Sequence, residues 1–294
     1  MKYLLFISIL AFFFACKKGV DVSDPDFDVT TEKTTYEVKD TIVFKFTGSA
    51  GIITFYSGEP GKEYQFRERF EVNGKPQMQF TSYSQFGPQN NTLQLMVSSD
   101  FKNVFDVESL SQATWTDITN RAVLSTGTDN KPSGVIDLSD FAKKDSAIFI
   151  AFKYTAKKLA VSQPTWTIKN LLIETKLEDG SLVSIAKSAD ISWGALNVLN
   201  ASKAWTYNTT QAQMSGGPID TDDNEDWLIS KPLSLNRVQR SLGVNVKNNP
   251  TALQTNYIFS GYPAPGIYTV TFEAINANRW DSRKIVKEIT ITVQ

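Results

Sequence analysis

The residue types that most often perform chemistry in proteins are scarce in this sequence. Its 294 residues include no histidine and a single cysteine, Cys16. The lack of histidine excludes the Ser-His-Asp triad, Cys-His pairs, histidine-bound zinc and imidazole acid–base catalysis. A single cysteine also excludes an intrachain disulfide and a thiolate metal cluster. Any catalysis would therefore depend on carboxylates, lysine, tyrosine or a carboxylate-bound metal.

Carboxylates are abundant, with 31 Asp and Glu residues. Two carboxyl groups can hydrolyse a glycosidic bond when they lie close together in space. In a chain with so many acidic residues some pair is always available, so the sequence gives this activity no specific support. A carboxylate-dependent glycosidase stays the least favoured alternative.

A short acidic run, DTDDNED at residues 220–226, is the best candidate for binding a metal. Calcium takes several oxygen ligands, and acidic side chains that alternate along a loop can supply them. The candidate ligands of a structural Ca²⁺ are Asp220, Asp222, Asp223 and Asp226. The run does not follow the EF-hand template, and the alternative is a solvated acidic turn.

Exposed aromatic rings are the second kind of candidate site. Proteins that bind sugars without acting on them stack an apolar sugar face on such a ring and orient it with a few polar groups. Four aromatic residues lie in polar, turn-like stretches and could form such a platform: Trp193, Trp205, Tyr207 and Trp280. Packing in a core is the alternative for each. Trp166 and Trp227 lie in strand-like stretches and are expected to be buried.

The N-terminal residues have the pattern of an export signal. Met1-Lys2 is followed by an apolar run over residues 3–15, which is too short for a comfortable membrane span. The change at Ala15-Cys16 resembles a bacterial lipoprotein cleavage site, which implies a signal peptide over residues 1–15 and a lipid on Cys16. Residues 16–25 would then be a flexible tether. An ordinary secretory signal or an uncleaved anchor is the alternative.

The rest of the chain has the composition and periodicity of an all-β protein. A net charge of −1 argues against nucleic-acid binding, which needs a concentrated basic surface. The stretches 266–274 and 285–293 alternate with a period of two, as half-buried strands do. Two strands cannot bury a stable core alone, and their best partners are 41–47 and 52–55.

These pairings predict two β-sandwich domains, one of them split. The small domain would consist of residues 26–66 and 239–294, and a larger sandwich over residues 67–238 would be inserted into it. Insertion requires the two ends of the larger domain to lie close together.

Several segments resemble known bacterial modules. YEVKDTIVFKFTG (36–48) and YPAPGIYTVTFEAINAN (262–278) resemble the two halves of a PKD-like, Ig-like domain. LQLMVSSDF (93–101) and EDWLISKPLSL (225–235) resemble jelly-roll, galactose-binding-like adhesin or anchor modules, in permuted order. With FYSGEPG (55–61), the whole chain resembles a family of Bacteroidota surface lipoproteins of unknown function.

Location and fold class are therefore easier to predict than chemistry. We expect a non-enzymatic lipoprotein of the outer membrane, held by lipid at Cys16, on the cell surface or the periplasmic face. The expected role is binding of a polysaccharide or surface glycan, with an outer-membrane transport system as a possible partner. The first alternative is an adhesion or structural protein that binds another protein.

Overall fold

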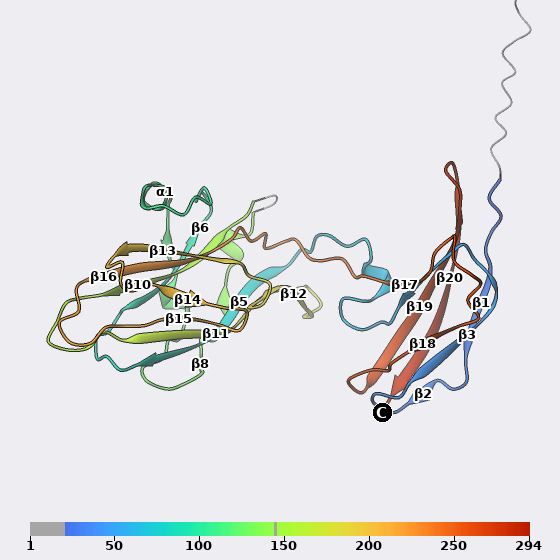
Figure 1. The fold of residues 1–294 in the computed structure, drawn as a ribbon, viewed down its shortest axis with the longest axis horizontal. Coiled ribbons are helices and arrows are strands. Elements are labelled where there is room, and N and C mark those ends of the chain that lie inside the picture. The colour runs from blue at the N-terminus through green and yellow to red at the C-terminus, as the bar shows by residue number, and fades with distance from the viewer. Residues whose placement is uncertain (1–20, 144–145) are drawn as a thin grey trace, which may run out of the picture. The chain divides into compact units, whose positions relative to one another are not determined.

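The computed structural model describes residues 21–143 and 146–294, and Cys16 lies outside this part of the chain. The described residues form twenty strands, one short α-helix and three 3₁₀ turns (Figure 1). The prediction of an all-β fold is confirmed. None of the described helices has the length and apolar character needed to cross a membrane.

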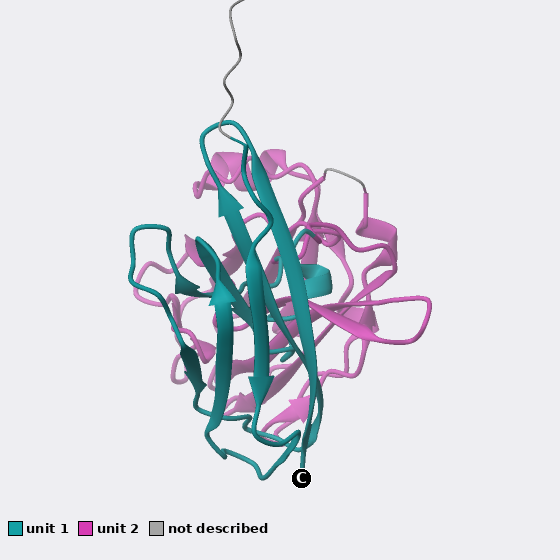
Figure 2. Cartoon of the chain, turned by 90° about the vertical axis from the view of Figure 1, so that its right-hand side faces the viewer, with its two compact units in different colours: residues 1–68, 240–294 teal, residues 69–239 magenta. Residues whose placement is uncertain are grey.

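The chain divides into two compact units (Figure 2). Unit 1 comprises residues 1–68 and 240–294, and unit 2 comprises residues 69–239. The described residues of unit 1 therefore come from two separate parts of the sequence, and unit 2 is continuous in sequence. The boundaries expected from the sequence are 66/67 and 238/239.

Unit 1 has two sheets. The three-stranded sheet has the order β1 (Asp26–Thr31), β3 (Ile42–Ser49), β18 (Asn256–Phe259). The five-stranded sheet has the order β17 (Val244–Lys247), β4 (Ile52–Tyr56), β19 (Gly266–Ala277), β20 (Ser282–Val293), β2 (Thr35–Tyr36). Strands β19 and β20 form the long antiparallel hairpin that the alternating sequence indicates.

Phenylalanines from both parts of unit 1 form its core. The ring of Phe272, on β19, lies 5.1 Å from Phe44, 5.3 Å from Phe46 and 5.1 Å from Phe55. Phe44 and Phe272 are fully buried. The strands near the two ends of the chain thus share one hydrophobic core.

Unit 2 also has two sheets. One has the order β13 (Trp193–Leu199), β16 (Asn224–Ser230), β10 (Phe149–Ala156), β6 (Leu93–Ser98), β7 (Thr116–Asp117). The other has the order β14 (Trp205–Tyr207), β15 (Gln211–Met214), β11 (Thr165–Lys176), β5 (Lys75–Gln85), β8 (Lys131–Pro132). Two further strands extend it, β12 (Leu182–Lys187) beside β11 and β9 (Ile136–Asp137) beside β5.

The main core of unit 2 takes side chains from both of its sheets. Phe80 of β5 and Phe152 of β10 meet edge to face at 5.2 Å. A second, smaller cluster contains Trp227 of β16, whose ring lies 5.1 Å from that of Trp115. The helix α1 (Val107–Gln112), capped by Asp106, contributes Leu110 to this second cluster.

The two ends of unit 2 run side by side. Val72 N donates to the carbonyl oxygen of Asn236 at 2.9 Å, and Val238 N donates to the carbonyl oxygen of Phe70 at 3.0 Å. Adjacent ends are what a domain needs in order to interrupt another one without disturbing its fold.

Candidate functional site

The four aromatic residues proposed as a platform do not form one. Trp205 is only 3 % exposed and belongs to the main core of unit 2, so the expectation that it lies at the surface is wrong. Trp193 is half-buried and packs against the same core, 6.0 Å from Phe152. Tyr207 and Trp280 are exposed, at 45 % and 65 %, but Tyr207 belongs to unit 2 and Trp280 to unit 1.

Trp205 is the one buried residue of β14, and its ring belongs to the main core of unit 2. Trp205 points inward, whereas the polar neighbours Lys203, Thr206 and Asn208 made the stretch look like a turn.

The acidic run does not bring its four carboxylates together. Asp223 accepts hydrogen bonds from Lys157 Nζ at 2.9 Å and Lys158 N at 2.8 Å, and Asp222 accepts from Lys158 Nζ at 2.8 Å. Over residues 21–143 and 146–294, no three Asp, Glu or Cys side chains are grouped so as to hold a metal ion. Asp220, Asp222, Asp223 and Asp226 are therefore not a shared ligand set.

Asp226 is separated from the other three by burial. It is 1 % exposed on β16, whereas Asp220, Asp222 and Asp223 are exposed. Burial raises the pKa of Asp226 to about 7, the hydrogen bond from Asn197 opposes that shift, and the nearby Glu225 adds to it.

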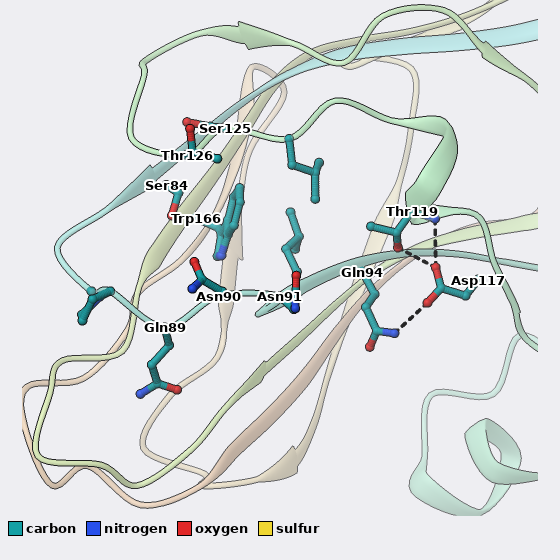
Figure 3. A pocket seen from close by; sticks show the side chains of 14 residues that line it. Ser84, Gln89, Asn90, Asn91, Gln94, Asp117, Thr119, Ser125, Thr126 and Trp166 are labelled. Carbon is teal, nitrogen blue, oxygen red and sulfur yellow. Dashed lines mark hydrogen bonds between the residues drawn. The ribbon is translucent and has the colours of Figure 1, made fainter.

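A crevice in unit 2 is a better candidate for a binding site (Figure 3). Its volume is about 470 Å³, within the range of pockets that hold small organic ligands. Most of its lining consists of neutral amide and hydroxyl side chains. The lining residues are Ser84, Gly87, Pro88, Gln89, Asn90, Asn91, Leu93, Gln94, Asp117, Thr119, Leu124, Ser125, Thr126 and Trp166.

Trp166 provides the aromatic part of the lining. It lies between the Ser125–Thr126 segment and the Asn90–Asn91 segment in Figure 3. Its indole Nε1 donates to Thr92 Oγ1 at 2.8 Å, which fixes the orientation of the ring. Trp166 is 5 % exposed and belongs to the main core of unit 2, so the crevice reaches down to that core.

The loop after β5 forms one wall and is held in place by close packing. Gln89 pairs with the backbone of Lys157, as Nε2 donates to its carbonyl oxygen and Oε1 accepts from its N–H, both at 2.9 Å. A Cβ on Gly87 would lie 2.4 Å from the backbone nitrogen of Pro164, so this approach requires glycine.

Asn90 and Asn91 present unengaged amide groups on this wall. Both residues are exposed, and their side chains make no hydrogen bond within the described part of the chain. An amide both donates and accepts hydrogen bonds, so these two side chains can bind a ligand rich in hydroxyl groups.

Asp117 is the only acidic residue among those that line the crevice. Burial tends to raise the pKa of this carboxyl group. Hydrogen bonds from Thr119 Oγ1 at 2.6 Å, Thr119 N at 2.9 Å and Gln94 Nε2 at 2.7 Å outweigh burial, and the pKa is lowered. The carboxylate therefore stays ionised at neutral pH and accepts hydrogen bonds.

Phe86 stands at the start of the same loop, directly before Gly87. It is 81 % exposed and has a φ of 69°, a conformation that is uncommon for a bulky residue. Sequence reasoning missed this residue and the crevice, because it ranked tryptophan and tyrosine and passed over the stretch FGPQNN at 86–91. An aromatic residue followed by Gly-Pro and two asparagines was the available signal.

The fold and the crevice define an all-β protein of two units, one of which carries a polar crevice with a single carboxylate. Residues 15–193 match the family described as Domain of unknown function (DUF5017), and the chain belongs to that family. The matched range contains every residue that lines the crevice. Neither the curated proteins nor the solved structures include a match to this chain.

Proposed function

We propose that this protein binds a polysaccharide or surface glycan without acting on it, and that the crevice of unit 2 is the binding site. The observation that carries the proposal is the lining itself: an oriented indole, several neutral amides and hydroxyls, and one ionised carboxylate. The chemistry of this set matches that of a sugar.

A sugar ring offers many hydroxyl groups, each of which both donates and accepts hydrogen bonds. Asn90 and Asn91 can meet such groups with either end of the amide, and Asp117, whose carboxylate already accepts three hydrogen bonds, can accept one more. The C–H face of a sugar packs against an exposed aromatic ring, and Phe86, which is 81 % exposed directly before Gly87, provides such a ring beside the crevice.

The carboxylate content of the crevice favours the proposal of binding over one of hydrolysis. Glycoside hydrolysis uses two carboxyl groups, one of which must hold a proton that it gives to the leaving group. Asp117 is the single acidic residue of the lining, and its lowered pKa leaves it without a proton at neutral pH. This site therefore supports binding better than it supports hydrolysis.

A second candidate function is adhesion to another protein. Strand β18 lies at the edge of the three-stranded sheet of unit 1 and carries Ile258, which is 62 % exposed. An edge strand presents unpaired backbone groups that a strand of another protein can pair with. Binding to a protein and not to any glycan would favour this candidate.

The proposal places the protein at the outer membrane, with lipid on Cys16 and an outer-membrane transport system as partner. A Cys16→Ser variant tests the anchor: it should leave the membrane fraction, and retention of the variant there would contradict lipid attachment.

Binding itself is tested with the purified chain on a glycan array and by gel electrophoresis in gels that contain the polysaccharides the array selects. Asn90→Ala should weaken binding roughly fivefold, because it removes about 1 kcal/mol of hydrogen bonding. Asn256→Ala, an exposed asparagine of β18 in unit 1, is the matched control and should bind normally. The proposal fails if the wild-type chain binds no glycan, or if both variants bind as it does.

A further inference from the structure

The six tryptophans of the chain differ sharply in exposure. Five of them are buried or half-buried in the two cores of unit 2: Trp115, Trp166, Trp193, Trp205 and Trp227. Trp280 is 65 % exposed and lies at the tip of the hairpin formed by β19 and β20, in unit 1. Tryptophan is highly buried on average in folded proteins, so the exposure of this one indole is unusual.

The hairpin tip holds this indole in a fixed position. Strands β19 and β20 pair to their ends, whereas the pairing of β19 with β4 stops at Ile275, so the tip extends past the neighbouring strand. Asn278 Oδ1 closes the turn by accepting from Trp280 N at 2.8 Å and from Asp281 N at 2.9 Å. The guanidinium of Arg279 lies over the indole, 4.8 Å from its centroid.

The same end of unit 1 receives the chain that comes from Cys16. Asn276 Nδ2 donates to the carbonyl oxygen of Ser23 at 3.1 Å, and its Oδ1 accepts from Gly51 N at 2.8 Å. Figures 1 and 2 both show the hairpin tip beside the place where the described chain begins. Ser23 follows Cys16 by seven residues. Because an extended chain spans at most about 3.6 Å per residue, a lipid on Cys16 would hold the base of the hairpin within about 25 Å of the membrane.

We propose that the tip of the β19–β20 hairpin docks on the phospholipid surface of the membrane that holds Cys16, with the Trp280 indole among the headgroups. Indole rings favour this depth because they combine an apolar body with one N–H donor. A lipid on a flexible tether leaves a protein free to turn, so a docked tip would fix the orientation of unit 1. The inference rests on the lipid proposed for Cys16 and does not depend on glycan binding.

Charge contributes less to this contact than the indole does. Arg279 can contact lipid phosphate groups from its place beside the ring. Arg283 and Lys284 already form ion pairs within unit 1. The tether adds the negative charges of Asp21 and Asp24, which oppose the attraction of an anionic membrane. Loss of the indole should therefore affect docking more than a change of lipid charge.

Quenching of tryptophan fluorescence by brominated lipids tests the contact. The full chain, purified in detergent, is reconstituted into vesicles of phosphatidylethanolamine and phosphatidylglycerol with brominated acyl chains. Bromine quenches only the indoles that it approaches, and residues 1–20 contain no tryptophan. The wild type should be quenched, and Trp280→Ala should lose most of this quenching. Equal fractional quenching of the two, or none in a wild type that floats with the vesicles, would overturn the docking alone. A chain that does not float would contradict the lipid on Cys16 as well.

A displaced indole provides the matched control. Ile267 is 75 % exposed and lies at the opposite end of β19, where it pairs with Thr292. Ile267→Trp, combined with Trp280→Ala, puts an exposed indole at that end, and this chain should not be quenched. Quenching as strong as in the wild type would overturn the proposal, because it would show that unit 1 meets the membrane without preference for the hairpin tip. Both positions are exposed, so we expect the variants to fold as the wild type does.

Discussion

The aromatic ring of Phe44, on β3, lies 5.1 Å from that of Phe272, on β19, in an edge-to-face arrangement. The two residues come from opposite ends of the sequence, and all of unit 2 lies between them. Both are fully buried, so unit 1 can form its core only when the two parts of its chain meet. Unit 2 is thus inserted in sequence between the two parts of unit 1.

The core of unit 1 predicts a large effect of one substitution. Phe272→Ala should lower the free energy of unfolding of unit 1 by about 3–5 kcal/mol, because it leaves a cavity among four other phenylalanines. Denaturant titration followed by circular dichroism measures the change. Phe86→Ala, at a position that is 81 % exposed, is the control and should change stability by less than about 0.5 kcal/mol. Equal stability of the two variants would contradict the shared core.

The close packing around Gly87 predicts that a substitution there disturbs the crevice wall. In Gly87→Ala the new Cβ would meet backbone atoms of Ser162, Gln163 and Pro164 at 2.4–2.5 Å, so the loop must move. We expect a loss of about 1–3 kcal/mol in stability and weaker glycan binding. Gly180→Ala is the control: its Cβ meets nothing within 4 Å, so only the cost of its φ of 85°, about 1 kcal/mol, should be seen, with binding unchanged. Unchanged glycan binding in Gly87→Ala would show that this wall is not part of the binding site.

The lowered pKa of Asp117 predicts how glycan binding depends on pH. Its pKa is lowered in the folded protein, so the carboxylate is ionised throughout pH 5–8 and glycan affinity should be constant over that range. Affinity should fall only at more acidic pH, when the carboxylate takes up a proton. Titration calorimetry at several pH values with a polysaccharide fragment measures this, and a tenfold change between pH 5 and pH 8 would be incompatible with the assigned role.

A substitution at the same residue gives a matched comparison. Asp117→Asn should weaken binding roughly tenfold, because hydrogen bonds to a charged group contribute about 1.5–3 kcal/mol. Asp137→Asn is its control, since Asp137 also accepts from the backbone N–H two residues later and lies outside the crevice. Equal losses in the two variants would show that the effect is structural.

Substitutions of Phe86 and Trp280 distinguish binding in the crevice from binding on the aromatic platform that the sequence predicts. Both are exposed, at 81 % and 65 %, but only Phe86 adjoins the crevice. Phe86→Ala should weaken glycan binding about fivefold through loss of stacking, and Trp280→Ala should leave it unchanged. The opposite result would show that the binding site lies in unit 1, which contains Trp280.

Strand periodicity made much of the fold predictable. The alternating stretches 266–274 and 285–293 are parts of β19 and β20, and the phase of Phe44 and Phe46 correctly indicated inward-facing residues. Alternation is a local property that one sequence displays directly. The all-β class followed from it.

The candidate site was not predictable in the same way. The crevice combines the loop after β5 with residues near 117 and 125 and with Trp166 of β11, and no local pattern shows that these segments meet. Asp226 is buried, unlike Asp220, Asp222 and Asp223, and the acidic run alone does not show this difference because burial depends on tertiary packing.

Hydrogen–deuterium exchange of the chain, with and without the polysaccharide that it binds best, tests the central claim most directly. The account predicts that the ligand slows exchange in peptides that cover residues 84–94 and 117–126, which form the crevice, while unit 1 is unaffected. Protection confined to unit 1, or no protection anywhere under saturating ligand, would contradict it.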